Sequence, residues 1–483
     1  MAHSTNRTRR TGFAAARAAV TGALVLLAAA GCKDILQVDD PGAILPGALP
    51  NELGARTAVT GAIGEFNRAY SGSGGDAFLS NNANFTDELM DSETFPTRTA
   101  TDKRDQFPFD QGNTTDGTYS RLHRARHLAV IARDLAAQFI TDPEEQSADV
   151  ALMNAIEGFS DVALAEAFCS GIPLSSVDAS GAVTFGAPLT TDQVLDSAIV
   201  YFDLALAAAT PGSDEANLAS VGKGRALLDK GDVAGAAAAV ASVPTEFVFR
   251  IGHSDTDGSE NNPIFSLQLN GRYTIVADNP DNPAANDNEG VNGQPFRAAN
   301  DPRVPWKDIG PGFDASIEVF SDELYNSLSE PVPFATGVEA RLIQAEAAQQ
   351  ASDASWLTIL NDLRDDVGTL MAGMYPNYED QLAGSDVTNT TLGPLSDPGT
   401  PAAQLDLIFS ERAFWMFITG HRLGDLRRLV RNYGRAQNTV FPDGPYHKGG
   451  EYGNDVAWPI PQEEQNNPLW VAEFPNGCDV DTP

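Results

Sequence analysis

The residues with the clearest capacity for chemistry are acids grouped around a glycine. Asp255, Asp257 and Glu260 flank Gly258 at short spacing, and oxygen ligands around a glycine turn are typical of calcium sites. The EF-hand pattern places glycine sixth and glutamate twelfth, so this cluster is more compact than that pattern. We keep these three acids as a calcium candidate. A solvated acidic turn is the simpler alternative.

Motifs that define enzymes are missing from the sequence. There is no Walker P-loop and no GxSxG nucleophile motif. His123 and His127 have a spacing that can hold zinc on one helix face. The glutamate of HExxH is absent, however, and arginines lie between the histidines, so a solvated basic helix face is the better interpretation. We predict that the protein is not an enzyme and has no cofactor apart from the calcium candidate.

Aromatic residues in polar segments are the remaining chemical signal. Segments 70–118 and 252–315 are rich in Gly, Ser, Asn and Asp and carry several Phe, Tyr and Trp. An exposed ring beside Asn, Asp or Arg suits a sugar, because the ring stacks on the C–H face while polar groups bind hydroxyls. Peptides could use the same surface, and the alternative is that the rings pin their loops to the body. Our ligand-binding candidates are Trp306, Tyr273, Phe95, Asn82 and Asp87.

The elements that must position these loops are predominantly helical. Apolar residues repeat every three to four positions through 190–209, and Thr190 with Gln193 forms a capping-box pattern. Segments 215–230 and 233–242, joined by Gly231-Asp232, predict an αα-hairpin of tetratricopeptide type. We therefore predict a mainly all-α fold of such hairpins, with long loop insertions and a few short strands. Further helices are expected at 119–139, 142–168, 337–350, 354–367 and 404–431, and strands at 248–249 and 264–269.

The N-terminus has the pattern of an export signal. Four arginines precede the apolar stretch 20–30, which is too short to span a bilayer. The small residues before Cys32 resemble a bacterial lipobox, although Ala29 stands where leucine is usual. We predict a signal peptide at 1–31, a single mature domain at 32–483, and acylation of Cys32 that anchors the protein to a membrane. The alternative is ordinary signal cleavage beside an incidental cysteine.

The net charge of the chain limits which classes of partner it can bind. The chain of 483 residues has 31 basic and 66 acidic residues, a formal charge of −35, which becomes −39 without residues 1–31. Such a surface repels nucleic acid, so we predict no nucleic-acid partner.

In an exported protein Cys169 and Cys478 could form a disulfide. The alternative is one buried thiol and one cysteine on the tail.

The pattern with the most information lies in segment 404–468. Glu411-Arg412, His421-Arg422 and Asp425-Leu426-Arg427-Arg428 precede Trp458-Pro459-Ile460-Pro461. This order resembles the SusD/RagB family of outer-membrane nutrient-binding lipoproteins, with its ER…EGxRxxDLxR helix and PIPxxE…NP segment. Segments 32–41, 301–303, 339–347 and 361–364 match further family motifs in part and in the same order. The family's acids are missing at Trp415 and Thr419.

The resemblance implies a function as well as a fold. Members of that family are lipid-anchored on the outside of the outer membrane, where they capture oligosaccharide or peptide for a SusC-like TonB-dependent transporter without catalysing a reaction. The alternatives are a lipid-anchored hydrolase and a helical-repeat scaffold protein. We expect Glu411, Arg412, Arg422 and Asp425 to form structural ion pairs on one long helix, with Glu346 paired to one of the arginines.

Overall fold

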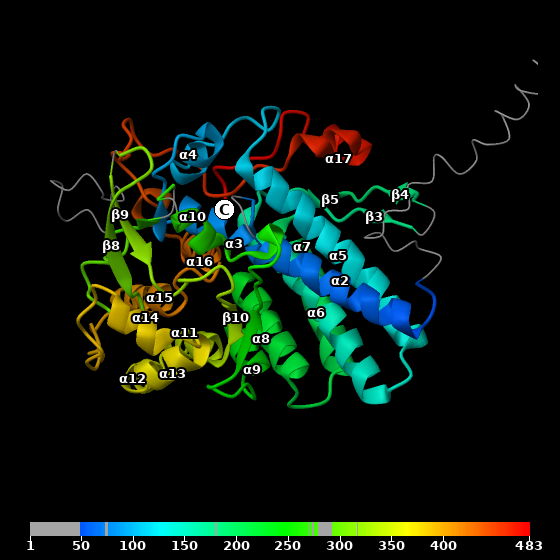
Figure 1. The fold of residues 1–483 in the computed structure, drawn as a ribbon, viewed down its shortest axis with the longest axis horizontal. Coiled ribbons are helices and arrows are strands. Elements are labelled where there is room, and N and C mark those ends of the chain that lie inside the picture. The colour runs from blue at the N-terminus through cyan, green and yellow to red at the C-terminus, as the bar shows by residue number, and fades with distance from the viewer. Residues whose placement is uncertain are drawn as a thin grey trace, which may run out of the picture. The chain divides into compact units, whose positions relative to one another are not determined.

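The structure is a computed structural model that describes residues 49–72, 76–178, 181–269, 271–272, 275–278, 292–315 and 317–483. Cys32 and Tyr273 lie outside these residues, as does the predicted signal peptide. In the described part helices predominate and all strands are in two-stranded sheets, which confirms the predicted mainly-α fold (Figure 1). No helix in these ranges is long and apolar enough to cross a membrane.

Consecutive helices pack against one another as antiparallel hairpins, and Figure 1 shows α2, α5, α6, α7 and α8 as one helical array. The helices of the unit Asn51–Pro483 are α2 (Glu52–Ser71), α3 (Phe78–Phe85), α4 (Pro96–Asp102), α5 (Thr114–Phe139), α6 (Pro143–Ala167), α7 (Thr191–Ala208), α8 (Asp214–Asp229), α9 (Val233–Ala239), α10 (Pro263–Gln268), α11 (Gly337–Gln350), α12 (Ser355–Asp365), α13 (Val367–Met374), α14 (Tyr378–Gly384), α15 (Pro401–Trp415), α16 (Arg422–Arg431) and α17 (Pro468–Glu473), with 3₁₀ turns at η2 (Gly258–Glu260), η3 (Gln437–Thr439) and η4 (Gln462–Asn466).

Local sequence explains where the predicted hairpin begins and turns. Thr190 and Gln193 form the reciprocal capping box at the start of α7, as predicted. The connection between α8 and α9 passes through Gly231 at φ +83°, a conformation that glycine adopts without strain. Asp232 then caps α9 by accepting a hydrogen bond from the Gly235 N–H at 2.9 Å.

The sheets are all antiparallel pairs. They join β1 (Leu89–Met90) to β7 (Ile275–Val276), β2 (Ile172–Pro173) to β5 (Pro188–Leu189), β3 (Ser176–Val177) to β4 (Val183–Thr184), β6 (Val248–Ile251) to β10 (Val332–Thr336), and β8 (Trp306–Pro311) to β9 (Glu318–Asp322). The strand predicted at 264–269 is wrong, because this segment is α10. Asn262 accepts hydrogen bonds from the Ile264 and Phe265 N–H groups there, and Pro263 occupies the first turn.

Two further predictions about elements are corrected. Segment 70–118 is no open loop, since α3, β1 and α4 lie within it and most of residues 77–93 are buried. The helix predicted at 404–431 is two helices, α15 and α16, separated by a turn with Ile418 at φ +47° and Gly420 at φ +85°. A Cβ on Gly420 would lie 2.4 Å from the Tyr70 hydroxyl, so only glycine fits this turn.

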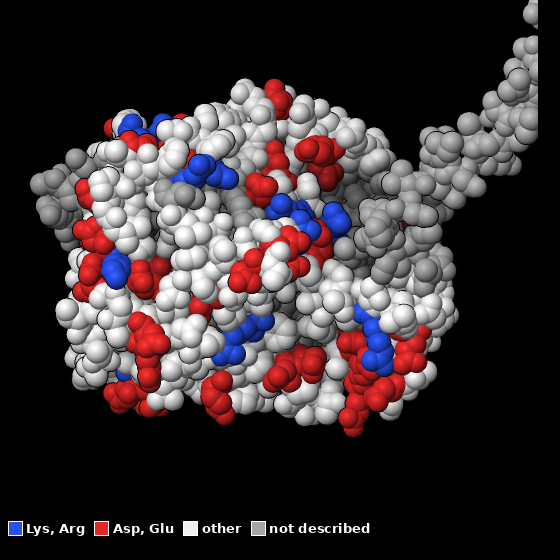
Figure 2. Space-filling model, in the orientation of Figure 1, with Lys and Arg blue, Asp and Glu red and all other residues white. Residues whose placement is uncertain are grey.

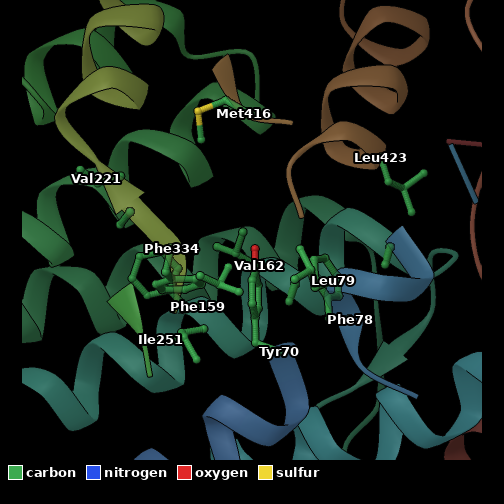
Figure 3. Packing of buried hydrophobic residues seen from close by; sticks show 14 of the residues in the cluster. Tyr70, Phe78, Leu79, Phe159, Val162, Val221, Ile251, Phe334, Met416 and Leu423 are labelled. Carbon is green, nitrogen blue, oxygen red and sulfur yellow. The ribbon is translucent and has the colours of Figure 1, made fainter. Parts of the chain in front are cut away.

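The surface is acidic, as the composition requires. Figure 2 shows acidic side chains scattered over the face that it draws, with smaller groups of basic side chains between them. The core beneath is aromatic where the helical array meets β10. Figure 3 shows Tyr70, Phe159 and Phe334 gathered there, and the ring of Phe334 lies 4.7 Å from Tyr70 and 4.5 Å from Phe159. These edge-to-face contacts hold α2, α6 and β10 together.

The end of the chain closes over this core. Arg104 is buried and donates hydrogen bonds of 2.7 Å to the carbonyls of Pro442, Gly453 and Asp455. Cys169 and Cys478 form a disulfide, with Cα atoms 6.0 Å apart. The pairing that the sequence left open is thus present, and it ties the end of α6 to the C-terminal tail.

Candidate functional site

The motif residues of α15 and α16 form a buried network of charges. Asp425 accepts hydrogen bonds from Arg412 at 3.0 and 3.1 Å and from Arg428 at 2.7 Å. Arg428 also donates to Glu346 at 2.6 Å, whereas the expected partners of Glu346 were Arg412 and Arg422. All four side chains are almost fully buried. Their contacts join α11, α15 and α16, so these residues hold the fold together.

A second part of the network extends toward segment 301–303. Arg303 is 1% exposed and donates to Asp301 at 2.7 Å and to Glu411 at 2.7 Å. Arg364 donates to the same Glu411 at 2.6 Å. Each buried charge has a partner of opposite sign, as a stable buried ion pair requires. The network therefore joins motif residues that are far apart in the sequence.

Electrostatics supports a structural role for the network. Burial alone would raise the pKa of Asp425, but the guanidinium groups of Arg412 and Arg428 hold it well below its usual range. The same competition lowers the pKa of Glu339 to about 2, because Arg225 donates to both of its oxygens. These carboxylates stay ionised and occupied at neutral pH, which suits fixed structural charges rather than proton transfer.

Asn82 and Asp87 belong to this interior, which corrects the expectation that they lie on a loop surface. The Asn82 amide donates to the Gly420 carbonyl at 3.0 Å, and its oxygen accepts from the Leu423 N–H at 3.2 Å. Asp87 accepts from Arg422 at 2.6 and 2.8 Å. Both side chains are at most 1% exposed. They fix the turn before α16 and do not face solvent.

Phe95 does lie on the surface, and a second exposed ring belongs to a neighbouring segment. Phe95 is 51% exposed at the start of α4, and Phe313 is 49% exposed just after β8. The guanidinium of Arg98 lies 5.1 Å from the Phe95 ring centre, and that of Arg272 lies 4.7 Å from the Phe313 ring centre. We call these four residues the paired-phenylalanine surface. Each ring is held by a cation–π contact and leaves much of its surface to solvent.

Backbone contacts bring the two halves of this surface together. The Asp314 N–H donates to the Ser92 carbonyl at 3.2 Å, and the Ser92 hydroxyl donates to the Gly271 carbonyl. The Phe313 N–H donates to the same Gly271 carbonyl at 2.8 Å. The segments that carry Phe95 and Phe313 are therefore joined a few residues from each ring.

Lys448 joins the same two segments by charge. Its ammonium lies 3.0 Å from Asp91 and 3.3 Å from Asp314, and it also donates to the Glu93 carbonyl. Burial raises the pKa of Asp91 to about 6, and the neighbouring Asp102 adds to this while Lys448 opposes it. The ammonium of Lys448 thus stabilises the buried carboxylate of Asp91 and also holds Asp314, which lies between β8 and β9. Sequence reasoning named neither Lys448 nor Arg272.

Trp306 lies at the base of the β8–β9 hairpin, away from its end. The ring is half-buried and meets Phe320 edge to face at a centroid distance of 5.6 Å. Its indole nitrogen is buried. Trp306 also packs against the main core, and its carbonyl accepts a hydrogen bond from the Asp386 N–H at 2.7 Å. It thus attaches the hairpin to the body, which is the alternative that the sequence left open. Its contact with a ligand stays a prediction.

The two candidate metal sites do not take the expected form. Asp257 accepts hydrogen bonds from the N–H and the hydroxyl of Ser259, both at 2.8 Å, and caps η2. No group of three or more His, Cys, Asp or Glu side chains in the described ranges could hold a metal ion, so Asp255, Asp257 and Glu260 do not converge there as a calcium site. His123 lies 4.5 Å from the Tyr119 ring, and burial lowers its pKa to about 3. It is therefore no solvated basic group.

The similarity of this chain to known proteins lies in its structure. No protein-family model matches the sequence, and no curated protein matches it either. The structure is similar to a SusD-like carbohydrate binding protein from Bacteroides vulgatus, with 15% identity and a TM-score of 0.56 over 86% of this chain and 96% of that one. A laminarin binding SusD-like protein is 14% identical, with a TM-score of 0.57 over 86% and 98% of the two chains. Surface glycan-binding protein A from Bacteroides uniformis is 11% identical, with a TM-score of 0.58 over 87% and 98%.

These similarities cover most of both chains in each case, and they agree with the order of the motifs in the sequence. The helical hairpins, the short antiparallel pairs and the buried network of α11, α15 and α16 all lie within the unit Asn51–Pro483. The chain therefore has the fold of the SusD-like proteins.

Proposed function

We propose that the protein captures oligosaccharides at the cell surface and binds them on the paired-phenylalanine surface. The observation that carries this proposal is the pair of half-exposed rings, Phe95 and Phe313, each beside an arginine. The C–H face of a sugar can stack on the flat ring while its hydroxyls accept hydrogen bonds from the guanidinium. One phenylalanine–arginine pair can therefore bind both the apolar and the polar groups of the ligand.

The structural relatives support a carbohydrate as the ligand. One relative is described as carbohydrate binding, one as laminarin binding and one as a surface glycan-binding protein. At 11 to 15% identity these proteins establish the fold, and the ligand of this chain is our proposal. A peptide ligand is the competing class, because amphipathic peptides also use aromatic and charged surfaces. We propose binding without catalysis, since the buried acids of the motif are occupied by arginines.

Cell location and partner complete the proposal. We propose that Cys32 is acylated, that the protein faces the exterior of the outer membrane, and that it passes its ligand to a SusC-like TonB-dependent transporter. The sequence before Cys32 supports the anchor. Metabolic labelling with a radioactive fatty acid should mark the wild-type protein and leave Cys32→Ser unlabelled. Co-purification of a large β-barrel protein from detergent-solubilised membranes would support the transporter, and its absence under mild conditions would contradict it.

The ligand is tested by affinity electrophoresis of the purified chain in gels that contain laminarin, soluble starch or xylan, followed by calorimetry with the glycan that retards it. Phe95→Ala and Phe313→Ala should each weaken binding about tenfold, as expected for a central aromatic contact. Phe185→Ala is the matched control, because Phe185 is also exposed, at 40%, but follows β4 instead. Equal affinity in all four proteins would refute the site. Binding of a peptide library, with no glycan bound, would refute the ligand class.

A further inference from the structure

A cavity lies between α2 and the loop that follows β6, and it is formed by other segments than those of the paired-phenylalanine surface. It has a volume of about 170 Å³ and is lined by Asn67, Arg68, His253, Ser254 and Glu260, with glycine backbone between them. This volume is below the roughly 300 to 1,000 Å³ of pockets for drug-sized ligands. It suits one small polar molecule.

The Arg68 side chain lines the cavity and is 38% exposed. Its Nε is buried and has no hydrogen-bond partner among the described residues. The closest acid is Glu65, whose Oε2 lies 4.0 Å from an Arg68 terminal nitrogen, beyond hydrogen-bond distance. Glu65 also faces Arg124, at 3.5 Å, so one carboxylate is shared by two arginines. An arginine whose donors lack acceptors binds an added carboxylate favourably, because its planar fork matches the two oxygens.

The opposite wall sets the charge of the cavity. The two ring nitrogens of His253 lie 3.2 Å from the Ser71 hydroxyl and 3.1 Å from the Glu260 carbonyl. Burial lowers the pKa of His253 to about 4, so the ring is uncharged at neutral pH. Arg68 is then the cation of the lining and Glu260 its acid. The lining residues include Arg68 and Asn67, whose side chains carry donors, and Glu260, whose side chain carries a carboxylate.

We propose that this cavity binds a small carboxylate, with the carboxylate group on the guanidinium of Arg68 and the donor groups of the ligand directed toward Glu260. Two sources supply this chemistry. In an amino acid the donor is an ammonium group, and in an acidic monosaccharide the donors are hydroxyls. A neutral sugar fits the volume but brings no anion to the guanidinium, so it lacks the charge-assisted hydrogen bonds that a carboxylate makes.

This site does not depend on the proposed function. The paired-phenylalanine surface is carried by segments 91–98, 271–272 and 308–315, while the cavity is formed by α2 and residues 252–260. Substitutions in one should leave binding at the other unchanged. A negative result in the glycan-binding experiment therefore does not decide whether the cavity binds a carboxylate.

The test is calorimetric titration of the purified full chain with glucuronate, serine and glucose, each at neutral pH. Arg68→Gln should weaken binding of the carboxylate about 10- to 100-fold, the effect of losing hydrogen bonds to a charged group. Arg68→Lys keeps the charge but loses the fork, and should give an intermediate loss. Arg56→Gln is the control, since Arg56 lies on the same helix but pairs with Glu52 and Glu145 outside the cavity.

One more variant distinguishes an amino acid from an acidic monosaccharide as the ligand. Glu260→Gln should weaken serine binding strongly and glucuronate binding little, because only the ammonium gains from a full negative charge. Thermal melting of each variant confirms that it is folded. Binding of neither carboxylate to the wild-type chain would overturn the proposal. Glucose binding as tightly as glucuronate would do so too, as would unchanged affinity in Arg68→Gln.

Discussion

Asp87 and Glu88 are adjacent acids that the fold treats in opposite ways. Asp87 accepts two hydrogen bonds from Arg422 and is an ionised partner in a buried pair. Glu88 is fully buried and accepts one hydrogen bond, from the Ile418 N–H at 2.8 Å, while its other oxygen has no partner in the described structure. Burial raises the pKa of Glu88 to about 8, and the charge of Asp87 adds to this. We predict opposite effects of the same acid-to-amide substitution at these two positions.

The sign and size follow from proton linkage. A carboxyl whose pKa is higher in the folded state contributes stability that is fully present below its unfolded pKa and is lost as the pH rises through the folded one. With pKa values of about 8 folded and 4.5 unfolded, Glu88 alone lowers the free energy of unfolding by about 3 kcal/mol between pH 5.5 and 8.5. Glu88→Gln removes this loss, because an amide keeps the acceptor for Ile418 and does not ionise.

The assay is differential scanning calorimetry of the wild type, Glu88→Gln and Asp87→Asn from pH 5.5 to 8.5. For a unit of this size about 1 kcal/mol changes Tm by about 1 °C. The fall in Tm with rising pH should therefore be smaller by about 3 °C in Glu88→Gln. Asp87→Asn leaves Arg422 buried without its anion and should lose about 3 to 5 kcal/mol at every pH. An unchanged pH slope in Glu88→Gln would refute the assignment of a protonated Glu88.

Three other substitutions test the network, the surface and the disulfide. Glu346→Gln leaves Arg428 with one anion fewer and should lower the free energy of unfolding by about 3 to 5 kcal/mol in calorimetry; a loss below 1 kcal/mol would contradict a structural role. Lys448→Met should weaken glycan binding about fivefold at a temperature well below Tm, because the two ring-bearing segments lose their shared cation; equal affinity would show that the backbone contacts suffice. Cys169→Ser removes the disulfide and should lower the free energy of unfolding by about 3 to 5 kcal/mol, and reductant should not lower it further in this variant. If reductant still destabilises the variant, the disulfide is not the cause of the reductant effect.

Sequence reasoning recovered the framework because helices follow local rules. Periodicity and the Thr190 capping box placed α7, and the Gly231-Asp232 turn placed the hairpin of α8 and α9. The motif residues were also predicted to form ion pairs, and the pair of Arg412 with Asp425 bears this out. Glu346 pairs with Arg428 and not with the expected Arg412 or Arg422. In these cases the signal lies in spacing, which a chain displays before it folds.

The errors arose where polar residues are buried by distant partners. Asn82 and Asp87 stand in a segment whose composition is typical of loops, yet their partners, Gly420 and Arg422, lie more than 330 residues away. No local pattern reveals that such a residue is inside. The break between α15 and α16 was missed for a similar reason, because the apolar run through Ile418 continues a helical pattern across the turn that Gly420 makes.

The candidate surface was recovered in part. Phe95 was chosen for its type and its polar surroundings, and it is exposed. Phe313 belongs to the same class and could have been ranked with it. Arg98, three residues after Phe95, offers a helical spacing that predicts the cation–π contact. Arg272 and Lys448 carry no such signal, because only the folded chain brings them to the two rings.

The closure of the core by the end of the chain has a consequence for biosynthesis. The three carbonyls that receive the buried Arg104 guanidinium are 338 to 351 residues further along, and Cys478 is 309 residues beyond Cys169. A ribosome must therefore release almost the whole chain before these groups find their partners, so the protein cannot complete its core during synthesis. Folding dominated by such distant contacts is slow. Loss of the last 40 residues should therefore yield a chain that cannot complete its core and is degraded. Late completion of the core would also suit the export that we propose, because a chain crosses a membrane unfolded.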